Sequence, residues 1–282
     1  MTRVIGIASG KGGVGKTTVS TNLALALRDF GKKVLLIDCN LSTPHLAYYL
    51  GVSNYKSTLN DAMLGKVGIE STPQLKDGIK YIPASLDLKD LNGIDTMDFK
   101  KHLKKLVASD KFDYIILDSA PGLGREALAV LDAAEEVIFV TTPFVPMVND
   151  IIRSAEVLKK LKGVKGVSVA MNMVTEGSHE IFGRSISGLT GFPISGQISY
   201  DQNVVYGLVA KSPIVNFKPN AASSVEFRKM AAGIAGVDYK APKSYTVKRA
   251  FRKVKNKIFS RSVSMSQSNE DISDDLSIQK MK

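Results

Sequence analysis

The sequence predicts an α/β fold in which a mostly parallel sheet carries helices on both faces. Short, nearly continuous apolar runs recur through the first 240 residues, as in strands that are buried on both faces. Amphipathic segments with helical spacing separate these runs. This alternation is typical of parallel sheets. The hydrophobic content of 44% over 282 residues suits a globular chain with a sizeable core.

The expected elements follow one another along the chain. Strands are expected at 4–8, 33–38, 79–82, 112–118, 136–142 and within 164–174, where the strand ends at Asn172. Helices are expected at 19–30, 57–64, 97–107, 147–161 and 221–236, with a further apolar helix within 198–217. The polar stretch 85–97 is interpreted as a loop. We therefore expect one domain over residues 1–240, a basic segment at 241–261 and a tail at 262–282.

A glycine-rich loop joins the first strand to the first helix. Residues 10–17 fit G-x-x-x-x-G-K-[S/T], the P-loop pattern. Its backbone N–H groups and the positive end of the following helix bind phosphate oxygens. Lys16 is expected to reach the β- and γ-phosphates, and the Thr17 hydroxyl to ligate Mg²⁺. The residues expected to bind the nucleotide are Gly10, Lys11, Gly12, Gly13, Val14, Gly15, Lys16, Thr17 and Thr18.

A dinucleotide-binding pattern competes with this interpretation. Three of the glycines also match G-x-G-x-x-G, and Asp38 ends the next strand, where such folds bind a ribose. The P-loop is favoured because a dinucleotide site does not need Lys16 and Thr17. A second acid, Asp118, also ends a later strand, where P-loop enzymes hold magnesium. We expect Asp118 to hold Mg²⁺ through water.

The loop that contains Lys11 resembles the deviant P-loop of the MinD/ParA family of ATPases, with archaeal MinD-like proteins as the most similar branch. The matching residues are Lys-Gly-Gly-Val-Gly-Lys-Thr-Thr at 11–18. In that family the extra lysine crosses to the nucleotide of the neighbouring subunit when two subunits enclose two ATP molecules. The resemblance implies an ATP-dependent homodimer in which Lys11 and Lys16 neutralise charge developing at the γ-phosphate. It covers about residues 1–240.

The loop after the second strand resembles switch I of this family. That loop usually carries two acids as D-x-D, whereas here Asp38 is followed by Asn40. The resemblance implies that both residues position the attacking water, and an amide holds water but cannot take a proton. We therefore expect hydrolysis that is slow or depends on a partner, or a nucleotide-binding switch with little turnover. His45 in the same loop is interpreted as structural.

Two further sites follow from the resemblance. Pro121 and Gly122 resemble switch II, whose backbone N–H groups sense the γ-phosphate. Asn172 matches the position at which the family reads the adenine edge, because a carboxamide both donates and accepts. The segment 198–217 resembles another part of the family that lies near the base.

The basic character of the chain is concentrated after residue 240. Of the net charge of +11, residues 241–282 supply +6, with eight Lys/Arg and no acid at 241–261. An apolar stripe at helical spacing, formed by Val247, Phe251, Val254 and Ile258, predicts a basic amphipathic helix. Such helices bind membrane surfaces, protein partners or nucleic acids, or are simply solvated. The Ser- and acid-rich tail at 262–282 is expected to be disordered.

These observations predict a MinD-like ATPase that uses ATP, ADP and Mg²⁺. It would dimerise on ATP and cycle on an anionic membrane surface to position a division site, a motility apparatus or a receptor array, with an activator or cargo protein. The alternative is a ParA-type partitioning ATPase that binds DNA through its tail. The single cysteine, Cys39, disfavours an Fe–S carrier and disulfides. With no run of 18 apolar residues and no signal peptide, the expected location is cytoplasmic, peripheral on the inner membrane face.

Overall fold

The computed structural model describes residues 1–161, 163–177 and 180–247. A helix begins at residue 243 and includes Val247, the last described residue. The predicted apolar stripe therefore lies outside the described residues, apart from Val247, which is exposed. The tail at 262–282 also lies outside them.

An eight-stranded sheet forms the centre of the described residues, with the strand order β3-β4-β2-β5-β1-β6-β7-β8. Neighbouring strands pair in parallel, except that β3 is antiparallel to β4 at one edge. The mostly parallel sheet predicted from the sequence is thus confirmed. The strands are β1 (Arg3–Ala8), β2 (Val34–Cys39), β3 (Gln74–Lys76), β4 (Ile79–Ile82), β5 (Tyr114–Ser119), β6 (Glu136–Thr141), β7 (Gly166–Val174) and β8 (Ile194–Ser199).

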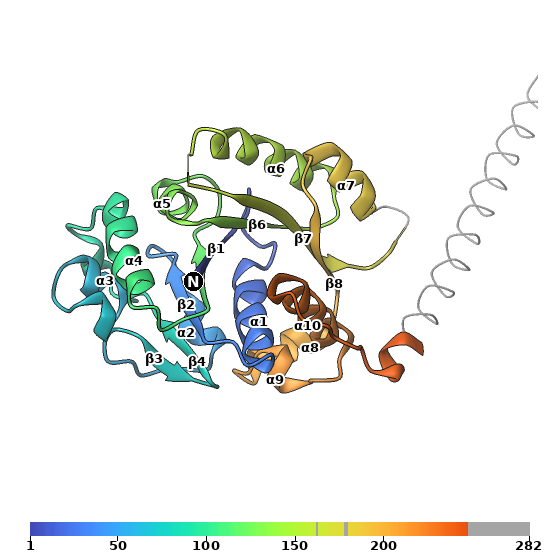
Figure 1. The fold of residues 1–282 in the computed structure, drawn as a ribbon, viewed down its shortest axis with the longest axis horizontal. Coiled ribbons are helices and arrows are strands. Elements are labelled where there is room, and N and C mark those ends of the chain that lie inside the picture. Colours follow the sequence, from blue (N-terminus) through green and yellow to red (C-terminus); the bar gives the residue numbers. More distant parts are fainter. Residues whose placement is uncertain (162, 178–179, 248–282) are drawn as a thin grey trace, which may run out of the picture.

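Helices cover both faces of the sheet (Figure 1). One face packs against α1 (Lys16–Asp29), α2 (Leu46–Tyr49), α9 (Ile214–Phe217) and α10 (Ala222–Ala235), with α8 (Gln202–Val209) beside α9. The other face packs against α3 (Leu59–Met63), α4 (Phe99–Ala108), α5 (Arg125–Ala133), α6 (Val145–Leu158) and α7 (Gly183–Thr190). Within the described ranges, no helix combines the length and the apolar character needed to cross a membrane.

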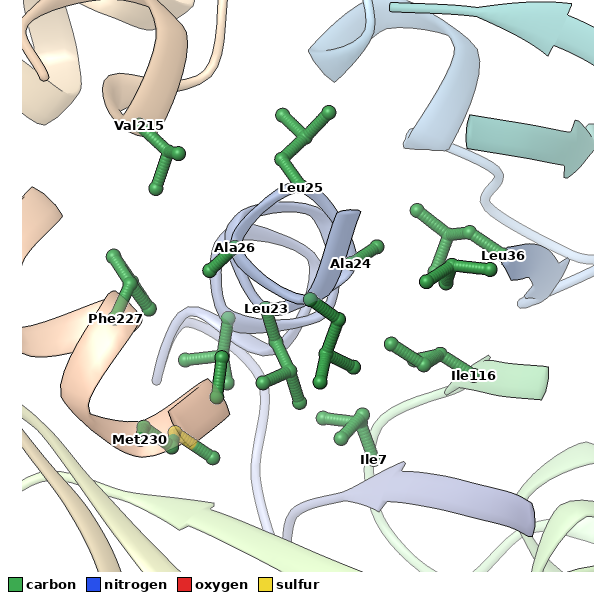
Figure 2. Close-up of a cluster of buried hydrophobic side chains, with 14 of the residues drawn as sticks. Ile7, Leu23, Ala24, Leu25, Ala26, Leu36, Ile116, Val215, Phe227 and Met230 are labelled. Atoms are coloured by element: carbon green, nitrogen blue, oxygen red, sulfur yellow. The ribbon is translucent and has the colours of Figure 1, made fainter. Parts of the chain in front are cut away.

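Helix α1 is enclosed by neighbouring elements, and this enclosure holds the glycine-rich loop in place. Residues 23–27 of α1 are all apolar and fully buried, so this part of the helix has no solvated face. Figure 2 shows Ile7 and Ile116 from the sheet on one side of α1 and Phe227 from α10 on another. Since β1 lies at the centre of the sheet and leads directly into the loop, the start of α1 is fixed at the carboxyl ends of the central strands.

The structure corrects several predicted boundaries and adds elements. Helix α1 begins at Lys16 rather than residue 19, and β7 continues to Val174, beyond Asn172. The predicted loop at 85–97 contains a short 3₁₀ helix at 88–91, and a second one at 96–98 overlaps its end. The sequence analysis did not assign α2, α5, α7, α9, β3 or β8. Strands β3 and β8 carry polar residues and lie at the sheet edges, so neither has the continuous apolar run by which the central strands were recognised.

Candidate functional site

The loop between β1 and α1 is pressed against β7 and α6 at two glycines. Gly15 precedes α1 with φ +89°, and a Cβ there would lie 2.3 Å from the Asn172 side-chain nitrogen. A Cβ on Gly10 would lie 2.3 Å from the Cβ of Asp150 on α6. Glycine is therefore required at both positions. Among the other predicted loop residues, Gly12 and Gly13 are exposed, Val14 is buried and Thr18 is half-buried in the first turn of α1.

The N-terminus of α1 is suited to bind an anion. The 14-residue helix has no side-chain cap and no acidic residue in its first turn. Its first N–H groups have no partner inside the helix, and the helix dipole places partial positive charge there. The P-loop sequence and this uncapped helix end together indicate a phosphate site.

Lys16 is held in the site by a serine that the sequence analysis did not single out. Only 8% of Lys16 is exposed, and its Nζ donates to Ser9 Oγ at 2.9 Å. Ser9 Oγ in turn donates to the carbonyl oxygen of Lys11 at 2.6 Å. Burial lowers the pKa of Lys16, while the negative charge of Asp118 opposes that shift. A bound phosphate would likewise favour the charged amine. The position of Ser9 directly before the glycine-rich loop is the signal that could have identified it.

The oxygen donors of Thr17 and Asp118 lie together, as expected for a magnesium site. Asp118, one residue before the end of β5, is a buried carboxylate that accepts from Ser20 Oγ at 2.8 Å and from the Thr17 hydroxyl. Burial raises the pKa of Asp118, and these two hydrogen bonds oppose that shift. Hydroxyl and carboxylate oxygens are hard donors that suit Mg²⁺. The residues present therefore fit the metal, and Ser20, one helical turn after Lys16, is a further residue that sequence reasoning missed.

Asp38 organises the predicted switch I loop through backbone hydrogen bonds. Its buried carboxylate accepts from the backbone N–H of Asn40 at 3.1 Å, of His45 at 3.1 Å and of Leu46 at 3.0 Å. Because Leu46 begins α2, Asp38 closes the loop and stabilises the start of that short helix. Burial, together with the negative charge of Asp118, raises the pKa of Asp38 to about 8.

The side-chain amide of Asn40 is engaged within the same loop. Asn40 Nδ2 donates to the carbonyl oxygen of Thr43 at 2.6 Å, and Asn40 Oδ1 accepts from the Thr43 hydroxyl at 3.1 Å. These two bonds fix the orientation of the amide and leave it one further N–H and one further oxygen lone pair. His45 is exposed and contributes its backbone N–H to the loop.

The predicted switch II lies directly on the glycine-rich loop. The Gly122 N–H donates to the carbonyl oxygen of Ser9 at 3.1 Å, and Gly122 adopts φ +76°. Pro121 approaches Gly12, where an added Cβ would lie 3.8 Å from the proline Cβ. Glu126 on α5 then accepts from the backbone N–H and the hydroxyl of Ser42 in switch I. The two predicted switch loops are thus connected through Glu126, which the sequence analysis did not identify.

Lys11 faces α6 of its own chain in this structure. Lys11 Nζ lies 3.6 Å from Asp150 Oδ2, and 54% of the lysine side chain is exposed. Among the described residues, Asp150 Oδ2 is the buried side-chain oxygen without a hydrogen-bond partner. Asp150 is therefore held mainly by the charge of Lys11. No pattern in the sequence distinguishes this acid from the others.

Asn172 supports the backbone of the glycine-rich loop. Its Nδ2 donates to the carbonyl oxygen of Val14 at 2.9 Å, and the residue is buried. The next residue, Met173, adopts φ +58°, where β7 departs from regular pairing with β8. The structure thus brings Asn172 to the predicted site through contact with the loop. Its reading of an adenine edge stays a prediction.

Comparisons with known proteins agree with this geometry. A family model described as "ParA: NUBPL iron-transfer P-loop NTPase" matches residues 1–235. An uncharacterized ATP-binding protein of Methanocaldococcus jannaschii is 30% identical over 242 residues, which cover 86% of this chain and 90% of that protein.

Solved structures of MinD share the fold. The septum site-determining protein MinD of Pyrococcus horikoshii, complexed with Mg-ADP, has a TM-score of 0.78 at 30% identity and covers 83% of this chain and 96% of its own. A chain of the MinC:MinD cell division protein complex of Aquifex aeolicus has a TM-score of 0.76 at 26% identity and covers 86% of this chain and 99% of its own.

Proposed function

The chain belongs to the ParA family of P-loop NTPases, and from this membership we propose that it is a MinD-like ATPase that dimerises on ATP and cycles on a membrane surface. The observation that carries the proposal is the pairing of a P-loop lysine, Lys16, with a second loop lysine, Lys11. Its similarity to MinD structures, one of them with Mg-ADP, supports the same conclusion. The structure that it would position is a division site, a motility apparatus or a receptor array.

We assign the nucleotide and metal to the residues described above. The loop amides and Lys16 would hold the phosphates of ATP or ADP. Thr17 and Asp118 would hold Mg²⁺, with Asp118 acting through water. When bound, Mg²⁺ supplies positive charge to the β- and γ-phosphates. Lys16 would neutralise charge that develops at the γ-phosphate, while Asn172 supports the loop.

Dimerisation on ATP would require Lys11 to exchange one anionic partner for another. In the single chain Lys11 lies against Asp150. The γ-phosphate of ATP bound to a second subunit would offer Lys11 more negative charge and more acceptor oxygens. The exposed position of Lys11 makes this exchange sterically simple. Asp150 would then lose its cation, so the exchange becomes favourable only when the nucleotide compensates for it.

We propose that hydrolysis is slow until a partner rearranges switch I. Both polar atoms of the Asn40 amide are bonded to Thr43, and the Asp38 carboxylate accepts three backbone N–H groups. Both side chains are therefore held in fixed orientations by the loop, so the water that they could position depends on the conformation of the loop. A contact that loosens the loop would release Asn40, which fits an activator protein. A binding switch with little turnover is the limiting case of the same geometry.

The membrane function rests on the sequence of the C-terminal segment. Val247, Phe251, Val254 and Ile258 would insert into an anionic surface on the inner face of the cell membrane, with the basic residues of 241–261 facing the headgroups. Two such segments in an ATP-bound dimer would bind together, which makes attachment depend on nucleotide. The tail at 262–282 would remain outside this contact. Iron transfer is not proposed because the chain has one cysteine.

The test is co-sedimentation of the full chain with anionic liposomes and, in parallel, with DNA, each with ATP or ADP. The variants are Lys11→Ala, Phe251→Glu and, as a matched control, Lys101→Ala, which removes an exposed lysine on α4. We expect liposome pelleting that requires ATP and is lost in the first two variants only. Pelleting with DNA but not lipid, with steep salt dependence, would assign the chain to the DNA-partitioning class. If the chain binds ATP without hydrolysing it, the remaining interpretation is a nucleotide-binding switch with little turnover.

A further inference from the structure

We propose that Glu226 and Tyr245 are positioning residues that join the start of the C-terminal helix to β7, the strand whose Asn172 supports the glycine-rich loop. Nucleotide binding and the anchoring of this helix would then strengthen each other. The inference rests on the proposed function, because it assumes that the loop between β1 and α1 binds a nucleotide. It goes beyond it by naming the residues through which the site and the C-terminal segment communicate.

The helix that begins at residue 243 is anchored to the domain by Tyr245. Tyr245 is 5% exposed, and its hydroxyl donates to Glu226 Oε1 on α10 at 3.0 Å. Lys229 Nζ lies 4.2 Å from the centroid of the tyrosine ring. Two residues later Val247 is exposed. Tyr245 is thus a defined attachment point, and Figure 1 shows this last described segment beyond α10, coloured orange-red.

Glu226 links this attachment point to the end of β8. The residue is 6% exposed, and its Oε2 accepts from the backbone N–H of Ser199 at 2.6 Å. Its Oε1 accepts from Ser199 Oγ at 2.8 Å, so the oxygen that binds Tyr245 also binds the serine. Hydrogen bonds to a buried carboxylate are among the stronger ones in proteins. A displacement of Ser199 therefore also shifts the Glu226 oxygen to which the tyrosine hydroxyl donates.

The end of β8 is in turn bonded to the strand that supports the glycine-rich loop. Ser199 pairs with Val174 of β7, and the Tyr200 N–H donates to the carbonyl oxygen of Val174 at 2.9 Å. Two residues before Val174, Asn172 donates to the loop. The contacts thus run without a gap from the loop through β7, β8 and Glu226 to Tyr245.

The region between Asn172 and Val174 has the geometry to transmit a change. Met173 adopts φ +58°, and the β7–β8 register is irregular between Met171 and Val174. A residue other than glycine seldom adopts this backbone conformation without support from its surroundings. When phosphate binding tightens the loop onto Asn172, the irregular segment can adjust and Ser199 with it. This coupling is reciprocal. If bound nucleotide strengthens the anchoring of Tyr245, then anchoring of Tyr245 raises the affinity for nucleotide by the same factor.

The test measures both directions of this coupling in the full chain. Isothermal titration calorimetry gives the Kd for MgADP, and hydrogen exchange reports residues 243–247 with and without MgADP. The variants are Tyr245→Phe, which removes only the hydroxyl, and Glu226→Gln, which keeps the size of the side chain. The control is Tyr114→Phe, because Tyr114 is equally buried but its hydroxyl bonds to Arg3 and to the carbonyl oxygen of Ile234, at the opposite end of the sheet and at the far end of α10 from Glu226.

We expect MgADP to slow exchange at 243–247 in the wild type. Both variants should lose this response and raise the Kd about two- to tenfold, the range that one or two hydrogen bonds provide. Tyr114→Phe should change neither readout. Wild-type binding of MgADP without any exchange response would overturn this inference alone, as would wild-type affinity and response in both variants. A wild-type chain that binds no MgADP would overturn the proposed function as well.

Discussion

Asp38 and Asp118 are register partners in the parallel pairing of β2 with β5. Both residues are 1% exposed, so two buried carboxyl groups stand side by side where adjacent strands end at the predicted nucleotide site. Burial and the charge of Asp118 raise the pKa of Asp38 to about 8. In the nucleotide-free chain, Asp38 therefore carries a proton near neutral pH, while Lys16 helps Asp118 to remain charged.

This pairing predicts that the nucleotide-free chain loses stability as the pH rises. Asp38 titrates near 8 when folded and at its ordinary value of 3.8 when unfolded, so the folded state binds more protons between these values. The free energy of unfolding should then fall by about 1 kcal/mol per pH unit up to the folded pKa. Urea unfolding between pH 6 and 8 measures this slope. Asp38→Asn should flatten it, and an equal slope in that variant would assign the effect to other groups.

Lys11 and Asp150 should be coupled in stability. Removing the lysine charge by Lys11→Ala leaves a mostly buried carboxylate without its cation, and we expect a loss of about 0.5–1 kcal/mol, since Lys11 is largely exposed. In an Asp150→Asn background the same substitution should cost close to nothing. A double-mutant cycle by urea unfolding measures the coupling. Equal costs in both backgrounds would show that the two residues do not interact in solution.

Two glycines of the same loop should respond differently to alanine. Gly10→Ala places a Cβ 2.3 Å from that of Asp150 and should cost about 1–3 kcal/mol, with weaker MgADP binding, because α6 or the loop must shift. At Gly12 the nearest atom to an added Cβ lies 3.8 Å away, an ordinary contact, so Gly12→Ala should be close to neutral for stability. Thermal unfolding of the two variants provides the comparison. Similar losses would mean that the loop in solution is not pressed against α6.

Asn172 should act mainly through the glycine-rich loop. Asn172→Ala removes the bond to the Val14 carbonyl, so the affinities for MgADP and MgGDP should fall by a similar factor of about two to ten. Calorimetric titration with both nucleotides distinguishes the two roles of this residue. A loss confined to MgADP would instead assign Asn172 to the adenine edge, as the family resemblance implies.

The elements predicted well are those with a local signal. The apolar run at 79–82 matches β4, and the run at 112–118 places Asp118 on β5 one residue before its end. Strand β8 was not predicted, because Gly196 and polar residues interrupt it at the sheet edge, where tertiary pairing with β7 decides its conformation. Helix α5 was also missed, although its residue Glu126 accepts from Ser42 in the predicted switch I loop.

The sequence by itself determined the sheet class, the glycine-rich loop and the acids at the ends of two strands, because each depends on neighbouring residues in the chain. Only the tertiary structure decided which distant groups meet them. Ser9 holds Lys16, Asp150 faces Lys11 and Glu226 joins Ser199 to Tyr245. Asp150 lies 139 positions after Lys11, and no local pattern marks it. Its role arises because α6 packs beside β6, next to the strand that carries the loop.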